Sequence, residues 1–307
     1  MRRVNLNAGP GPTATSQQKF AWTLESFREI ERASQFLDIG SSPSTVRTAL
    51  GVQQAVTANT TYFVRSDGND GNTGLANSSS GAFLTIGKAL SATSLLYLGG
   101  FTVTVQVVDG TYATGGSLTL PASGGAIILQ GNTSSPQNVV LTDSAISVSN
   151  GAALSILGFE LRGTSSAPCL SATTNGIINL TGAMRYGAAT NSHQFAAAGG
   201  IVINSANYTI SGSPALGHWR VSADGILQAI SRVITLTGTP AFGSGTSAFA
   251  WAEIVGNITA TSTTFVGSGT GQRYFAQAGG VIFTSGGGAN YLPGDSAGNN
   301  ITGGIYA

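Results

Sequence analysis

Short runs of alternating apolar and polar residues recur along most of the chain, and most of them begin at a glycine. Alternation of this kind is typical of a strand with one buried face. Six of these glycines follow one another at nearly equal steps: Gly100, Gly125, Gly151, Gly176, Gly200 and Gly225. The run 251–258 and then Gly280 continue the series with slightly longer steps. A nearly constant period of roughly 25 residues predicts a solenoid in which each period is one coil.

Each period also contains a second strand-like run, such as 194–198 before Gly200 and 219–223 before Gly225. Solenoids of similar period built from helices need a helix in each unit, and periods so rich in Gly, Ser, Thr and Asn disfavour one. The predicted fold class is therefore all-β. We expect a single-stranded right-handed parallel β-helix of about 8 coils, each of roughly 24–28 residues, over residues 99–285.

The pattern changes before residue 58, where apolar residues recur at helical spacing. This N-terminal helical segment, 1–58, presents an apolar stripe that about 25 residues cannot bury alone. We predict that the stripe attaches the chain to a larger particle through Phe20, Trp22, Leu24, Phe27 and Ile30. The alternative is that it packs against the chain's own β-domain.

Two shorter segments border the predicted β-helix. Residues 59–98 are expected to form a strand, a turn and an amphipathic helix over 84–98 that covers the first coil, with Thr85 as its cap. Residues 286–307 are expected to form a separate C-terminal fibre end.

Composition removes several classes of function. The 307 residues include 44 glycines, and only 8% are charged, against roughly 25% in ordinary soluble domains. The net charge is +1 without a basic tract, which argues against nucleic acid as a partner. We expect no membrane insertion, because no run of about 20 apolar residues occurs. We also expect no cofactor, and a packing role for the single Cys169.

Several segments resemble known families. Residues 62–74, YFVRSDGNDGNTG, and 81–90, GAFLTIGKAL, resemble the opening of pectate-lyase-like β-helix domains. Residues 45–51, TVRTALG, and 291–298, YLPGDSAG, resemble pieces of phage tail fibres and tailspikes. The resemblance implies a homotrimer located on a virion, made in the cytoplasm of a bacterial host and held to other virion proteins by its N-terminal segment.

Many proteins of this fold class cleave polysaccharides, which requires two converging carboxylates or a carboxylate with a basic residue. Adding one period of 25 residues to the number of each acidic residue predicts which residue lies next to it in the following coil. Glu160 meets Arg185, whereas Asp143 meets Pro168 and Asp224 meets Phe249. Because no acid stacks on another acid, we predict a structural subunit without enzymatic activity. The alternative is a polysaccharide-cleaving spike whose acids converge across two subunits.

Binding of a host surface glycan is a separate possibility. Aromatic residues that could stack on sugar rings are Trp219, Trp251, Tyr186, Tyr208, Phe249 and Tyr274, with core packing as the alternative. The Glu160/Arg185 pair is a polar sugar contact or a surface ion pair. His193 stacks on His218, which suits a structural pair better than a metal site. Asp67 and Asp70 fit an Asx-stabilised turn better than a calcium site, so no metal is predicted.

Overall fold

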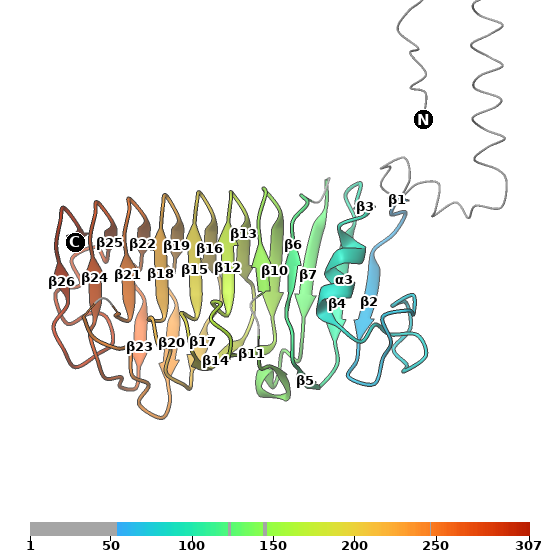
Figure 1. Ribbon diagram of the computed structural model, residues 1–307, viewed down its shortest axis with the longest axis horizontal. Helices are drawn as coiled ribbons and strands as arrows, with labels where there is room; N and C mark the ends of the chain where they lie inside the picture. Colours follow the sequence, from blue (N-terminus) through green and yellow to red (C-terminus); the bar gives the residue numbers. More distant parts are fainter. Residues whose placement is uncertain (1–53, 122–123, 144–145, 246) are drawn as a thin grey trace, which may run out of the picture. The chain divides into compact units, whose positions relative to one another are not determined.

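The computed structural model describes residues 54–307 except 122–123, 144–145 and 246. These residues form one unit, a right-handed parallel β-solenoid of about eight turns, which confirms the predicted fold class. Each complete coil contributes one strand to each of three sheets, and Figure 1 shows the strands of successive coils lying in parallel rows. The predicted helical segment and its attachment residues Phe20, Trp22, Leu24, Phe27 and Ile30 lie outside the described residues.

The first sheet has ten strands, and we call it the ten-stranded sheet. Its strands are β2 (Thr60–Val64), β4 (Thr102–Val107), β7 (Ala126–Gln130), β10 (Ala153–Leu157), β13 (Ile177–Leu180), β16 (Ile201–Asn204), β19 (Ile226–Gln228), β22 (Asn257–Thr259), β25 (Val281–Phe283) and β27 (Ile305–Tyr306).

The second sheet has seven strands and the third has eight, named here in the same way. The seven-stranded sheet comprises β5 (Gly110–Tyr112), β8 (Val139–Leu141), β11 (Phe159–Gly163), β14 (Met184–Ala189), β17 (Tyr208–Ile210), β20 (Val233–Leu236) and β23 (Thr264–Val266). The eight-stranded sheet comprises β6 (Gly116–Leu118), β9 (Ile146–Val148), β12 (Leu170–Thr173), β15 (Gln194–Ala197), β18 (Trp219–Ser222), β21 (Ala250–Ala252), β24 (Tyr274–Ala276) and β26 (Asn299–Asn300).

The repeated glycine exists because the backbones of neighbouring coils approach closely at one corner. Before Gly200, the chain turns through Ala198 and Gly199, which both have positive φ. A Cβ atom on Gly200 would lie 2.1 Å from the carbonyl oxygen of Ala172 in the preceding coil. Only glycine fits such a contact with backbone. Gly225 meets the carbonyl oxygen of Ala196 in the same way, so the period of the sequence is the period of this corner.

Inward-pointing side chains stack into ladders that fill the solenoid. The strand register of the ten-stranded sheet aligns one such ladder, whose members are Val103, Ile127, Leu154, Ile178, Val202, Leu227, Ile258 and Ile282. All eight side chains are buried. No single coil could remove its apolar surface from water, so the stacking of coils supplies the hydrophobic stabilisation.

One coil is longer than the predicted range. Ile201 pairs with Ile226, but Ile226 pairs with Asn257 in the next coil, because a loop follows β20 before β21 begins at Ala250. The prediction that Asp224 stacks on Phe249 is therefore wrong, since the backbone N–H of Asp224 donates to the carbonyl of Ile254.

A helix covers the first coil. Helix α3 (Ile86–Thr93) is shorter than the predicted 84–98, and Thr85 caps it by accepting a hydrogen bond from the backbone of Lys88. The chain then forms β3 (Leu96–Tyr97), which pairs with β1 (Gln54–Ala55). Helix α3 packs against β6, and this contact seals one end of the apolar core. Within the described residues, no helix is long and apolar enough to span a bilayer.

The C-terminal segment continues the solenoid. Strand β26 pairs with β24, and β27 pairs with β25. Gly304 occupies the corner position that Gly280 has one coil earlier, and it follows the positive-φ residues Thr302 and Gly303. The boundary predicted after residue 285 therefore does not separate this segment from the β-helix.

Candidate functional site

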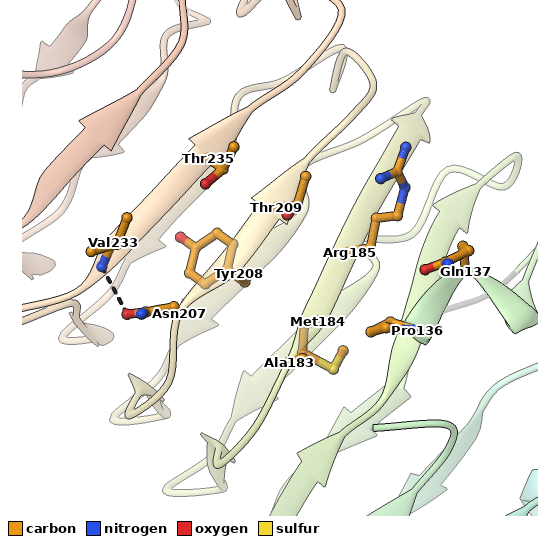
Figure 2. A pocket seen from close by; sticks show the side chains of 10 residues that line it. All are labelled: Pro136, Gln137, Ala183, Met184, Arg185, Asn207, Tyr208, Thr209, Val233 and Thr235. Carbon is orange, nitrogen blue, oxygen red and sulfur yellow. Dashed lines mark hydrogen bonds between the residues drawn. The ribbon is translucent and has the colours of Figure 1, made fainter. Parts of the chain in front are cut away.

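A groove of about 270 Å³ lies on the outer face of the seven-stranded sheet. Figure 2 shows its side chains along β14, β17 and β20, with the short 3-10 helix η1 (Pro136–Asn138) at one end. The lining residues are Pro136, Gln137, Ala183, Met184, Arg185, Asn207, Tyr208, Thr209, Val233 and Thr235. Arg185 is the one charged side chain among them, so the groove is polar with a positive end.

The strand register explains how this polar row arises. Glu160 pairs with Arg185, Arg185 with Thr209, and Thr209 with Thr235. The predicted stacking of Glu160 on Arg185 is confirmed. Because residues in register repeat on the same face of each coil, four polar outward positions in successive coils form a continuous stripe.

Glu160 is held by two arginines. Its carboxylate is only 4% exposed and accepts a hydrogen bond of 2.6 Å from Nε of Arg162. Nε of Arg185 lies 3.1 Å from the other carboxylate oxygen. The predicted ion pair is present, but the carboxylate is buried and the pair includes a third residue, Arg162. The sequence does contain a signal for Arg162. Side chains alternate between the two faces of a strand, so Arg162, two residues after Glu160, lies on the same face as Glu160.

Arg185 retains unused hydrogen-bonding capacity. Its Nε is buried without a hydrogen-bond partner, because the N–H does not point at the nearby oxygen of Glu160. The side chain as a whole is 35% exposed. Two arginines share one carboxylate, so this cluster carries one surplus positive charge at a place open to solvent. A guanidinium in this state suits a carboxylate or another planar anion.

Two predicted sugar-stacking residues point into the core. Tyr186 and Trp219 are completely buried, so a sugar ring cannot reach either ring face, and the prediction for both is wrong. Each follows or precedes an arginine that points outward, Arg185 and Arg220. Side chains alternate across a strand, so this neighbour relation was a signal in the sequence that Tyr186 and Trp219 point inward.

Trp219 belongs to a buried chain of hydrogen bonds. Its Nε1 donates to the hydroxyl oxygen of Tyr208 at 3.0 Å, and that oxygen lies 2.8 Å from Nε2 of His218. Nδ1 of His218 lies 2.9 Å from Nδ1 of His193, and Nε2 of His193 lies 2.7 Å from the carbonyl oxygen of Gly187. The predicted stacking of the two histidines is confirmed. Each ring nitrogen is hydrogen-bonded to a group of the protein, as expected for a structural pair.

These contacts define one arrangement of protons. A carbonyl only accepts, so His193 donates through Nε2 and, when neutral, accepts at Nδ1. His218 then donates through Nδ1 and accepts the Tyr208 hydroxyl proton at Nε2. Burial lowers the pKa of His193 to about 4, and burial with the neighbouring histidine lowers the pKa of His218 well below its usual range. Both rings are therefore neutral near pH 7.

Tyr186 belongs to a second buried network. Nε2 of Gln194 donates to the Tyr186 hydroxyl at 2.8 Å, and the amides of Gln194 and Asn204 exchange hydrogen bonds of 2.9 and 3.0 Å. Asn204 pairs in register with Leu180, so an amide interrupts an apolar ladder here. Burial raises the pKa of Tyr186 well above its usual value. The amide pair leaves none of these polar groups without a partner.

The remaining aromatic candidates have protein partners on their faces. Trp251 points outward from β21 but is covered by the guanidinium of Arg220, 4.2 Å from the ring centroid. Tyr274 stacks on Tyr306 at 3.7 Å, and Phe249 lies 4.8 Å from the ring of Trp219. Packing is thus the observed role of Tyr274 and Phe249, whereas sugar binding at Trp251 stays a prediction.

Asp67 and Asp70 stabilise the turn before α3. Asp67 accepts two hydrogen bonds from Arg65, which lower its pKa. Asp70 accepts from the backbone N–H groups of Leu84 and Thr85 and from the Thr85 hydroxyl. These contacts match the predicted Asx-stabilised turn. Among the described residues, no group of three or more His, Cys, Asp or Glu side chains could hold a metal ion.

Comparison with protein-family models, with curated proteins and with solved structures finds no match to this chain. The parallel β-helix is compatible with fibres, spikes and polysaccharide-binding proteins. Because one fold serves several functions, the side chains on the outer surface of the coils decide which function this chain can perform.

Proposed function

We propose that the chain is a structural fibre or spike subunit of a phage-like particle, that three copies associate, and that each binds an acidic host glycan in the Arg185 groove. The N-terminal segment would hold the subunit to other virion proteins. The single observation that carries the glycan proposal is the groove itself, a polar stripe with one partly exposed arginine.

The chemistry of the groove favours an acidic sugar. Thr209, Thr235 and Asn207 offer hydroxyl and amide groups of the kind that bind sugar hydroxyls. Arg185 offers the planar donor set that matches a sugar carboxylate. These residues belong to three successive coils, about 4.8 Å apart, so an extended saccharide lying along the stripe would contact all of them.

Binding is favoured over cleavage by the state of Glu160. Both of its carboxylate oxygens lie against arginines, which supports a structural role. Cleavage of a glycosidic bond commonly needs a carboxylic acid that can donate a proton and a second carboxylate. Neither role suits a carboxylate held between two guanidinium groups.

The proposal is tested by measuring the binding of the full-length chain to alginate, polygalacturonate and polysialic acid, with dextran as the neutral control. We expect at least one acidic polymer to bind, and Arg185→Gln to weaken that binding by about tenfold, the loss of roughly 1.4 kcal/mol. Arg273→Gln removes the same charge outside the groove and should leave affinity unchanged. Equal binding by both variants, or new reducing ends in the polymer, would contradict the proposal.

A further inference from the structure

The ten-stranded sheet differs from the other two in having no charged residue in any of its described strands. The seven-stranded sheet contains Glu160, Arg162 and Arg185, and the eight-stranded sheet contains Arg220. The charge-free surface runs along the whole stack of coils, from β2 to β27.

The outward positions of this sheet are uncharged: one row is largely apolar from β7 onward, the other mixes apolar with polar residues, and Thr61, Thr102 and Thr104 are polar at the β2 and β4 end. Strand pairing aligns them into two rows on the outer face. The first row is Ala126, Ala153, Ile177, Ile201, Ile226, Asn257, Val281 and Ile305, and the second is Ile128, Ser155, Asn179, Ile203, Gln228, Thr259 and Phe283. All of these side chains are partly or fully exposed. A shallow depression of about 260 Å³ lies over Ala126 and Ala153.

We infer that the outer face of the ten-stranded sheet is the interface between copies of this chain, which lie parallel to one another. In a symmetric parallel assembly, each residue near the axis meets its own counterpart, so any charge there would face a like charge. Like charges placed opposite each other are destabilising. Such a self-association therefore requires a face without charges. The ten-stranded sheet provides this face, whereas the other two sheets carry charged residues.

The size of the face also fits a second copy. Ten strands about 4.8 Å apart, with about four residues across at 3.3 Å each, cover roughly 600 Å² per copy. Two such faces together reach about 1,200 Å², the lower end of the range for specific interfaces. In an assembly of three copies the face of each copy contacts both neighbours, and a copy of this chain presents a charge-free surface of equal length.

The corner beside this face carries exposed apolar residues in one coil, next to the exposed Asp224 of the coil before it. Ile254 and Val255 form the turn between β21 and β22, and they are 53% and 56% exposed. Both have positive φ, which is unfavourable for β-branched residues. Retention of two exposed apolar residues in a strained turn is expected where they contact a partner.

This inference deepens the proposed fibre function and depends on it for the number of copies, three. The test uses the full-length variants Ile201→Lys and Ile201→Glu, each analysed by light scattering and thermal unfolding. Ile201 lies in the middle of the first row, between Ile177 and Ile226. We expect each variant alone to remain folded but to dissociate to the mass of a single chain. Ile201→Leu, which keeps an uncharged side chain of the same size, should remain associated.

Ser171→Lys is the matched control, because Ser171 points outward from β12 of the eight-stranded sheet. This variant should remain associated. If the unmodified chain is monomeric, both the interface and the trimeric fibre are contradicted. If the unmodified chain is trimeric but Ile201→Lys and Ile201→Glu stay trimeric, the interface is overturned while the fibre function stands.

Discussion

The outer faces of the ten-stranded and seven-stranded sheets share one backbone architecture but carry opposite chemistry. Both are stacks of parallel strands that repeat once per coil. The ten-stranded sheet presents Ile177, Ile201 and Ile226 in register, whereas the seven-stranded sheet presents Glu160 and Arg185. The repeat therefore determines the shape, and the choice of outward residues determines which face can bind a copy and which can bind a polar ligand.

The two faces depend on a common interior. Trp219, Tyr208 and the two histidines connect the inner surfaces of the seven-stranded and eight-stranded sheets through buried hydrogen bonds. Damage to this interior should abolish association and ligand binding together. A substitution on one face should abolish one property and leave the other. This difference makes the comparison testable.

Acidification should have the largest effect, because it acts on the shared interior. The folded-state pKa of His193 is about 4, below its ordinary value of 6.5. As pH falls below 6.5, His193 becomes protonated in the unfolded chain but stays neutral in the folded chain. The free energy of unfolding therefore falls. Each pH unit costs about 1.4 kcal/mol per histidine, or about 3 kcal/mol for His193 by pH 4.

The measurement is urea unfolding at pH 7, 5.5 and 4.5, together with mass and glycan binding at each pH. Stability should fall across this range, and both functions should disappear only where unfolding begins. A free energy of unfolding that is flat between pH 7 and 4.5 would show that the buried histidines are not held neutral.

Relief of strain at the corner should have the smallest effect and the opposite sign. Val255 has a φ of 53°, in the left-handed region. The equivalent position in an earlier coil also has a positive φ, but it is occupied by an asparagine, Asn175. A left-handed conformation costs about 1–2 kcal/mol for most residues, and asparagine tolerates it better. Val255→Asn should therefore raise the free energy of unfolding by about 1 kcal/mol while weakening association.

Thermal unfolding and light scattering of Val255→Asn would separate the two effects. Val266→Asn is the control, because Val266 is also exposed but does not have positive φ. This control should not stabilise the protein. A lower free energy of unfolding for Val255→Asn, compared where both chains have the same mass by light scattering, would mean that the turn is not strained.

Much of the fold follows from the sequence, since the glycines that mark the period are the residues that the coil corner requires. Gly304 continues that period, but the following short strand, Ile305–Tyr306, gives little alternation by which to recognise a coil. The longer coil between Ile226 and Asn257 was hidden because a loop adds residues without changing the strands on either side. Coil length therefore failed as a guide to which residues stack beyond Gly225.

Side-chain direction was harder to predict than the repeat. Glu160 and Arg185 follow from spacing, whereas the sequence leaves sugar binding and core packing as alternatives for Tyr186 and Trp219, and the structure shows core packing. Their charged neighbours indicate the inward direction, but the buried partners come from other coils and sheets. No local pattern in the sequence predicts that Asn204 meets Gln194.

The central claim is that copies of the chain meet at the ten-stranded sheet, and cysteine cross-linking tests it most directly. The chain's own Cys169 is buried, and burial raises its pKa to about 12, so an introduced surface thiol would react selectively. Ile201→Cys treated with a short bis-maleimide should give covalent dimers on a denaturing gel, and Ser171→Cys should not. Dimers from Ser171→Cys alone would place the contact on the eight-stranded sheet and contradict the account.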